Sequence, residues 1–133
     1  MSSVFKVLPQ YLVASVNVLV EQCHGAAATA GWWTDLNTGL STKDANNVPE
    51  KLMLTVSEIG EAMEGHRKNL RDEHLPEFLS IEVELADAII RICDLSGAKG
   101  YRLAEALAAK MEYNSTRADH KPENRAGANG KKY

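Results

Sequence analysis

Apolar residues recur at helical spacing through most of this chain, and no segment shows the alternation typical of a β-strand. One stripe, with successive spacings of 4, 3 and 4 residues, contains Leu52, Val56, Ile59 and Met63. A second stripe further along the chain contains Phe78, Leu85, Ile89 and Ile92. We predict helices over residues 9–30, 49–70, 77–96 and 101–117, with the first of these stripes facing the core and the second on one side of its helix. The expected fold class is all-α, a bundle of four main helices.

The first predicted helix begins at Pro9, which suits the first turn of a helix, and stops before Gly31. Its apolar residues lie on more than one face, which indicates burial on several sides. In so short a chain, part of that burial is expected to come from another copy, so we predict a homodimer or homotetramer. The segment "GWWTDLNTGLSTKDANNVPE" follows and predicts a loop, because it is rich in Gly, Thr, Asn and Asp. Loops of this length are usually functional or disordered.

The composition is that of an ordinary globular domain, with 44% hydrophobic and 25% charged residues among 133. A net charge of −3 argues against a nucleic-acid partner, which would favour a basic surface. Two cysteines, Cys23 and Cys93, are too few for a disulfide scaffold, so we expect a cytoplasmic location. No apolar run reaches the roughly 18 residues of a membrane span, so no membrane partner is expected. We predict one helical domain over residues 1–117 and a polar, mobile tail over 118–133.

The second and third predicted helices carry acidic pairs that repel each other. Glu58 and Glu61 are three residues apart, and so are Glu84 and Asp87. Side chains three apart share a helix face, where like charges cost a few tenths of a kcal/mol per pair. Two antiparallel helices would bring the four carboxylates together across one groove. Such a group cannot stay fully ionised without compensation.

A divalent cation would provide that compensation. Oxygen ligands alone favour Mg²⁺, with Mn²⁺ as the alternative, and the absence of sulfur and imidazole disfavours zinc or copper. A di-iron site would require Glu-x-x-His on two helices, which this chain lacks. The competing interpretation is that these carboxylates form solvated helix faces, as isolated Glu-x-x-Glu pairs usually do.

The fourth predicted helix has a stripe that begins apolar and then turns polar without changing direction. Its residues, spaced by 4, 3, 4 and 3, are Leu103, Leu107, Lys110, Asn114 and Arg117. A lysine, an amide and an arginine suit the recognition of phosphate oxygens. Two other interpretations stay open: the end of the helix enters water, or its cations pair with the carboxylates.

Together these residues resemble a known family. The order Glu58-x-x-Glu61, twenty-two intervening residues and Glu84-x-x-Asp87 is similar to that of the MazG-like nucleoside triphosphate pyrophosphohydrolases. These belong to the all-α NTP pyrophosphatase superfamily, which also includes the dimeric dUTPases. The short single-domain phage and bacterial members are also similar to "CHGAAATAGWW", "LMLTVSEIGEAMEGHR", "LPEFLSIEVELADAIIRICDLSG" and "AKMEYNSTR". Residues 34–49 have no clear counterpart in the family, and the tail is longer and looser than in these members.

The resemblance implies a Mg²⁺-dependent enzyme for nucleotide-pool control. It would cleave a nucleoside or deoxynucleoside triphosphate between the α and β phosphates, giving a monophosphate and pyrophosphate. The implied metal ligands are Glu58, Glu61, Glu84 and Asp87, and the implied triphosphate contacts are Lys110, Asn114 and Arg117. Glu61 is also a candidate to orient or deprotonate the attacking water.

Aromatic residues near the nucleobase are a further implication of the resemblance. Trp32 and Trp33 could stack on a base, and His24 could border the same pocket. The alternatives are that the tryptophans pack the loop onto the bundle, which we favour for Trp33, and that His24 lies on the helix surface. Base preference stays open. Alternative functions are hydrolysis of another nucleotide (dUTP or phosphoribosyl-ATP) and a non-catalytic helical interaction module.

Overall fold

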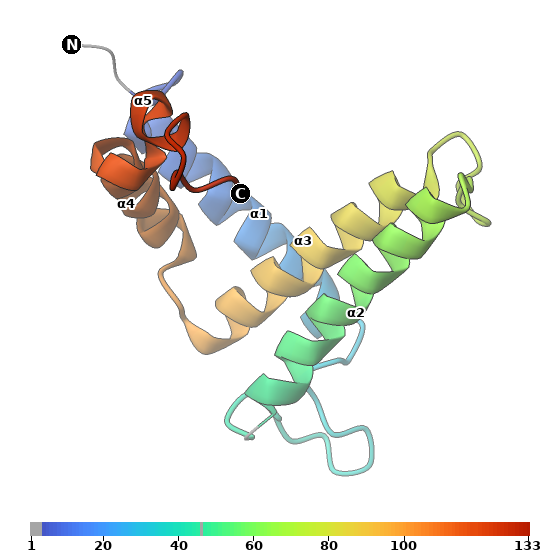
Figure 1. The fold of residues 1–133 in the computed structure, drawn as a ribbon. Coiled ribbons are helices and arrows are strands. Elements are labelled where there is room, and N and C mark those ends of the chain that lie inside the picture. Colours follow the sequence, from blue (N-terminus) through green and yellow to red (C-terminus); the bar gives the residue numbers. More distant parts are fainter. Residues whose placement is uncertain (1–3, 46) are drawn as a thin grey trace. The chain divides into compact units, whose positions relative to one another are not determined.

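The structure, a computed structural model, describes residues 4–45 and 47–133 (Figure 1). Its elements are α1 (Pro9–Thr29), α2 (Val48–Arg67), α3 (Ser80–Lys99), α4 (Leu103–Thr116), the 3₁₀ helix η1 (Ala118–His120) and α5 (Pro122–Arg125). The extended contacts within the described residues are isolated bridges, Thr34–Ser41 and Arg71–Leu79. The all-α prediction is confirmed, and the four main helices lie within a few residues of their expected positions. No helix in the described ranges is long and apolar enough to cross a membrane.

The chain divides into two compact units, each described by itself. One unit comprises Leu19–Tyr101, and the other comprises Met1–Val18 together with Arg102–Tyr133, of which residues 1–3 lie outside the described part. The predicted tail contains η1 and α5 and belongs to the second of these units. The predicted metal ligands all belong to the first, which we call the hairpin unit.

The ends of α2 and α3 follow from local backbone chemistry. The carboxylate of Glu82 accepts a hydrogen bond of 2.7 Å from the Leu79 N–H and so caps the start of α3. Gly100 has φ of 68°, the left-handed conformation that commonly follows a helix C-terminus. The helix α2 ends at Arg67, three residues before the predicted end at Leu70, because Asn69 turns to a φ of 53°.

Small side chains form the contact between α2 and α3, which lie side by side as an antiparallel pair (Figure 1). Ala62 and Gly65 are buried on α2, and Ala88 is buried on α3. A Cβ atom on Gly65 would lie only 2.7 Å from the Cβ of Ser80, so there is no room for one. The two backbones therefore approach closely at this end of the pair.

The predicted burial of the α2 stripe is wrong within the single chain, and the α3 stripe is exposed as well. Their eight residues are 42% to 61% exposed: Leu52, Val56, Ile59, Met63, Phe78, Leu85, Ile89 and Ile92. At 100° per residue, the α2 stripe lies roughly 130° around the helix from the buried face that contains Ala62 and Gly65. The close contact is thus made by the small residues, and the large apolar residues point elsewhere.

The close approach at Gly65 gives a testable prediction. Gly65→Ala should lower the free energy of unfolding by about 1–3 kcal/mol, because the new methyl group overpacks the contact with Ser80. Gly60→Ala is the matched control, since nothing lies within 4 Å of a Cβ at Gly60 in the same helix. That control should gain about 0.5–1 kcal/mol from helix propensity. Urea denaturation followed by circular dichroism measures both, and equal effects at the two glycines would contradict the packing.

Candidate metal centre

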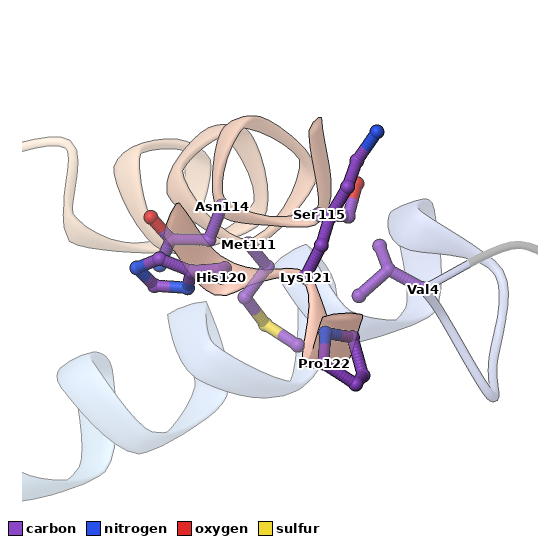
Figure 2. A pocket seen from close by; sticks show the side chains of 7 residues that line it. All are labelled: Val4, Met111, Asn114, Ser115, His120, Lys121 and Pro122. Carbon is purple, nitrogen blue, oxygen red and sulfur yellow. The ribbon is translucent and has the colours of Figure 1, made fainter. Parts of the chain in front are cut away.

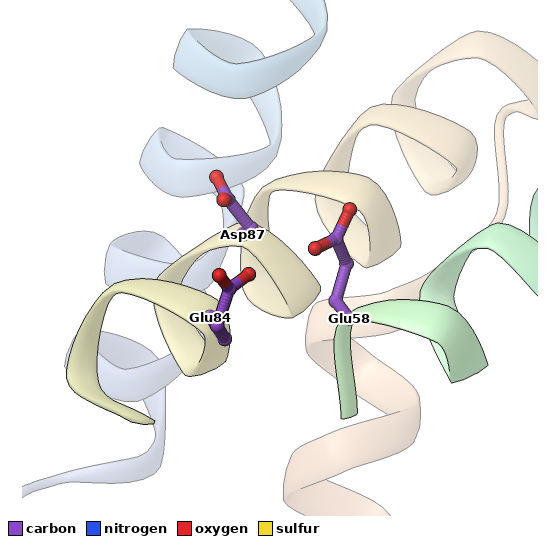
Figure 3. A group of neighbouring side chains, drawn as sticks. All are labelled: Glu58, Glu84 and Asp87. Atoms are coloured by element: carbon purple, nitrogen blue, oxygen red, sulfur yellow. The ribbon is translucent and has the colours of Figure 1, made fainter. Parts of the chain in front are cut away.

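Three of the four predicted carboxylates come together between α2 and α3. Figure 3 shows Glu84 and Asp87 rising from neighbouring turns of α3, with Glu58 rising from α2. One carboxylate oxygen of each residue lies within 4.8 Å of those of the other two. Glu58 is buried, and the other two side chains are partly exposed. We call these three residues the acid cluster.

Among the described residues, Arg91 is the cation that pairs with the acid cluster. Its Nε atom donates to Oε1 of Glu58 at 2.6 Å. Burial, a hydrogen bond with Glu58 and the charges of neighbouring carboxylates raise the pKa of Glu84 from 4.5 to about 7. The pKa of Asp87 is also raised, by burial and then by the charge of Glu58, although Arg91 opposes this. One guanidinium therefore leaves the acid cluster with excess negative charge.

The fourth predicted ligand, Glu61, lies one turn beyond Glu58 on α2 and is exposed. Its charge is one cause of the raised pKa of Glu84, so it belongs to the same electrostatic neighbourhood. It is not one of the three residues whose oxygens lie within 4.8 Å of one another. Glu61 is therefore an outer carboxylate, closer to solvent than Glu58.

The donor atoms of the acid cluster fit a hard divalent cation. Mg²⁺ binds oxygen at 2.0–2.1 Å, which separates its ligand atoms by roughly 3 Å in cis and 4 Å in trans. A group of oxygens spanning 4.8 Å reaches that geometry by small side-chain rotations. Carboxylate-only donors suit Mg²⁺, Ca²⁺ or Mn²⁺ better than zinc or copper.

A second polar group in the hairpin unit centres on Asp94, a residue that the sequence analysis missed. Its Oδ1 atom accepts a hydrogen bond of 2.7 Å from Nε1 of Trp33 and lies 3.0 Å from Nδ1 of His24. The rings of His24 and Trp33 also meet edge to face at 6.0 Å. Lys51 lies 4.7 Å from the centre of the Trp33 ring. Asp94 follows Asp87 by seven residues and Arg91 by three, so the sequence could have placed all three on one face of α3.

These contacts distinguish the three residues that were predicted to lie near a nucleobase. Trp33 is only 2% exposed, so it packs the loop against the rest of the unit, as we favoured from the sequence. His24 is held by Asp94 and is not a free surface residue. Trp32 is 70% exposed and presents its ring to solvent. The contacts of Asp94 with Trp33 and His24, which we call the Asp94 clamp, hold the long loop on α3. Lys99 adds to them by donating to the backbone carbonyls of Lys43 and Ala45.

The phosphate-contact candidates all lie on or just after α4, in the unit outside the hairpin. Lys110 and Arg117 lie 4.9 and 5.8 Å from the ring centre of Tyr113. Arg117 also forms an ion pair of 2.6 Å with Asp119. Asn114 lines a pocket of about 380 Å³ together with His120 (Figure 2). The Oδ1 atom of Asn114 and the Nε2 atom of His120 are buried and have no hydrogen-bond partner among the described residues.

Comparison of the chain with protein-family models, with curated proteins and with solved structures found no match. The family resemblance therefore stays an interpretation of the residues themselves.

The raised pKa of Glu84 predicts how stability depends on pH. The unfolded chain releases the proton of Glu84 near pH 4.5 and the folded chain near pH 7, so the folded state holds the extra proton between these values. In EDTA, this group should make the free energy of unfolding fall as pH rises from about 4.5 to about 7. Glu84→Gln cannot ionise and should gain stability relative to wild type across this window. Urea denaturation at several pH values tests this, and a constant difference between the two proteins would contradict it.

The Asp94 clamp gives an independent prediction. Asp94→Ala should lower the free energy of unfolding by about 1–3 kcal/mol, because it leaves the Trp33 N–H without its acceptor. Tryptophan emission should shift to the red as Trp33 gains contact with water. The control is Asp44→Ala, in an exposed turn of the same loop, which should change neither property. Unchanged emission in Asp94→Ala would show that the loop does not depend on this contact.

Proposed function

We propose that this chain is a MazG-like pyrophosphohydrolase. It hydrolyses nucleoside or deoxynucleoside triphosphates between the α and β phosphates and uses Mg²⁺, or alternatively Mn²⁺. The single observation that carries the proposal is the convergence of Glu58, Glu84 and Asp87 between α2 and α3. Their pattern in the sequence is also the one that resembles the family.

The electrostatics of the acid cluster support a bound cation over a purely structural role. Arg91 pairs with Glu58, yet the pKa of Glu84 remains raised to about 7. A structural ion-pair network would be expected to balance its charges, because an uncompensated buried carboxylate is costly. An excess of negative charge is what a divalent cation would relieve.

In the proposed reaction, Glu58, Glu84 and Asp87 would hold the metal, with Glu61 as an additional ligand. When bound, the metal neutralises the triphosphate and lowers the pKa of an attacking water. Glu61 is exposed beside the acid cluster, so it can accept a proton from that water or orient it. Arg91, which pairs with Glu58 beside the acid cluster, would be available to a phosphate oxygen if Glu58 held the metal instead.

The substrate's other contacts are assigned on the same proposal. The family resemblance implies Lys110, Asn114 and Arg117, which belong to the other compact unit, as contacts of phosphate oxygens through charge and hydrogen bonds. The exposed ring of Trp32 stacks on the base, while Trp33 and His24 hold its loop in place. Asp94, the anchor of this loop, is seven residues beyond Asp87, or roughly 10 Å along α3. That separation suits a nucleotide whose phosphates lie at the acid cluster and whose base lies at the loop.

The proposal includes the setting in which the enzyme works. We place it in the cytoplasm, where nucleoside triphosphates are made and used. We also propose a homodimer or homotetramer as the working form.

A nucleotide panel tests the proposed reaction. The protein with Mg²⁺ should convert at least one nucleoside triphosphate to its monophosphate and pyrophosphate, separated by chromatography, and EDTA should abolish this. Glu58→Gln should lower turnover by about 100-fold or more, because metal neutralisation contributes several kcal/mol to the transition state. Glu61→Ala should lose turnover while keeping the helical circular dichroism spectrum.

A control variant tests whether the loss of turnover is specific to the acid cluster. Glu64→Gln is the matched control, because Glu64 lies on the same helix and pairs with Arg67 and Lys68 on the surface. It should retain full activity. Correctly folded protein that turns over no nucleotide would overturn the proposal, and release of inorganic phosphate in place of pyrophosphate would overturn the bond assignment.

A further inference from the structure

Two cysteines of the hairpin unit lie against each other. Cys23 belongs to the part of α1 that lies in this unit, residues 19–29, and Cys93 belongs to α3. Both are free thiols, and they are hydrogen-bonding partners. Neither thiol takes part in the acid cluster or in the Asp94 clamp, so their contact is a separate feature of the unit.

The backbones of α1 and α3 are close together beside the two thiols. A Cβ atom on Gly97 would lie only 2.6 Å from the Cβ of His24, so there is no room for one. His24 and Asp94, which directly follow the two cysteines, meet at 3.0 Å although they are 70 residues apart in the chain. A disulfide requires Cα atoms roughly 4.4–6.8 Å apart, which two helices reach only where their backbones approach closely. The packing therefore holds the thiols where a bond between them needs little movement of either helix.

The two thiols differ in their access to solvent. Cys93 is 4% exposed, whereas Cys23 is partly exposed. Burial, and then the neighbouring Cys23, raise the pKa of the Cys93 thiol, so it stays protonated at neutral pH. Cys23 is therefore the thiol that a reagent from solution meets first. Cys93 is placed to react afterwards, with the sulfur of Cys23.

We propose that Cys23 and Cys93 form a reversible disulfide when the protein meets a small oxidised disulfide such as oxidised glutathione. The Cys23 thiolate attacks one sulfur of the reagent, its S–S bond breaks, and one reduced glutathione leaves with the proton that Cys23 gave up. The Cys93 thiolate then attacks the Cys23 sulfur of this mixed disulfide, and the second glutathione leaves with the proton of Cys93. Two protein thiols are oxidised and one reagent disulfide is reduced, so protons and electrons balance.

The disulfide would reinforce the Asp94 clamp. The clamp residues His24 and Asp94 directly follow the two cysteines. The new bond therefore joins the same two chain segments that hold the loop of Trp33. In the oxidised protein these segments cannot separate even when the hydrogen bonds of the clamp open. This inference concerns the hairpin unit alone and does not depend on the reaction proposed above.

Peptide mapping of the full chain, after incubation with excess oxidised glutathione in EDTA, tests the disulfide. Most of the wild type should yield peptides joined through Cys23 and Cys93 within one chain, and dithiothreitol should restore both thiols. The midpoint of urea denaturation should rise by about 1 M or more, because closing a loop of about 70 residues lowers the entropy of the unfolded chain. Thiols that stay free in the folded wild type would overturn the proposal, and so would a bond found only between two chains.

The two single variants are matched controls, since serine preserves the size of each side chain. Cys93→Ser should stop at the mixed disulfide of Cys23 with glutathione, because no second thiol is left to displace it. Cys23→Ser should leave Cys93 unmodified until the protein is unfolded, because that thiol is buried. Glutathione attached to Cys93 in the folded Cys23→Ser protein would contradict the order of the two steps. The wild-type map decides on the disulfide itself even where a variant folds poorly.

Discussion

The close contact between α2 and α3 is the constraint on which the rest of the hairpin unit depends. Gly65 leaves no space for a Cβ beside Ser80, and Ala62 and Ala88 are almost completely buried. This contact brings the backbones close enough for Glu58 to reach the carboxylates of α3. A larger residue at the contact would separate the helices and the carboxylates together. The packing and the candidate metal centre are therefore one structural feature.

Folding alone gives no reason for the acid cluster. Replacing buried charged groups by apolar residues of similar volume is often neutral or stabilising. Here the arrangement raises the pKa of Glu84 to about 7, and Arg91 compensates only part of the charge. A group of carboxylates that weakens the apo fold is better explained by what it binds. The excess negative charge favours a bound cation, and the family resemblance is the reason to propose a triphosphate as the substrate.

The sequence was sufficient for the helices and for the two acidic pairs, because each of these depends on spacing within one helix. It could not distinguish Glu61 from the three carboxylates that come together across two helices. The sequence was not sufficient to predict which neighbour each side of a helix contacts. The period of Leu52, Val56 and Ile59 identifies an apolar side of α2 but does not say what that side contacts. The small residues that make the contact have weak periodic signals, so their role emerged only when the helices were placed together.

The Asp94 clamp shows the same limit at longer range. Its position follows Glu84, Asp87 and Arg91 by helical spacing, so a polar face could be extended that far from the sequence. Its partners His24 and Trp33 are 70 and 61 residues away, and no local rule connects them. Trp33, whose indole N–H donates to this distant carboxylate, is buried, while its neighbour Trp32 is exposed.

The acid cluster and the exposed apolar stripes affect stability in opposite ways. The carboxylates cost stability, since they repel one another before any ligand binds. Burial of the apolar stripes would offset that cost at about 25 cal/mol for each Å² removed from water. A cation bound among the carboxylates would relieve the same repulsion directly.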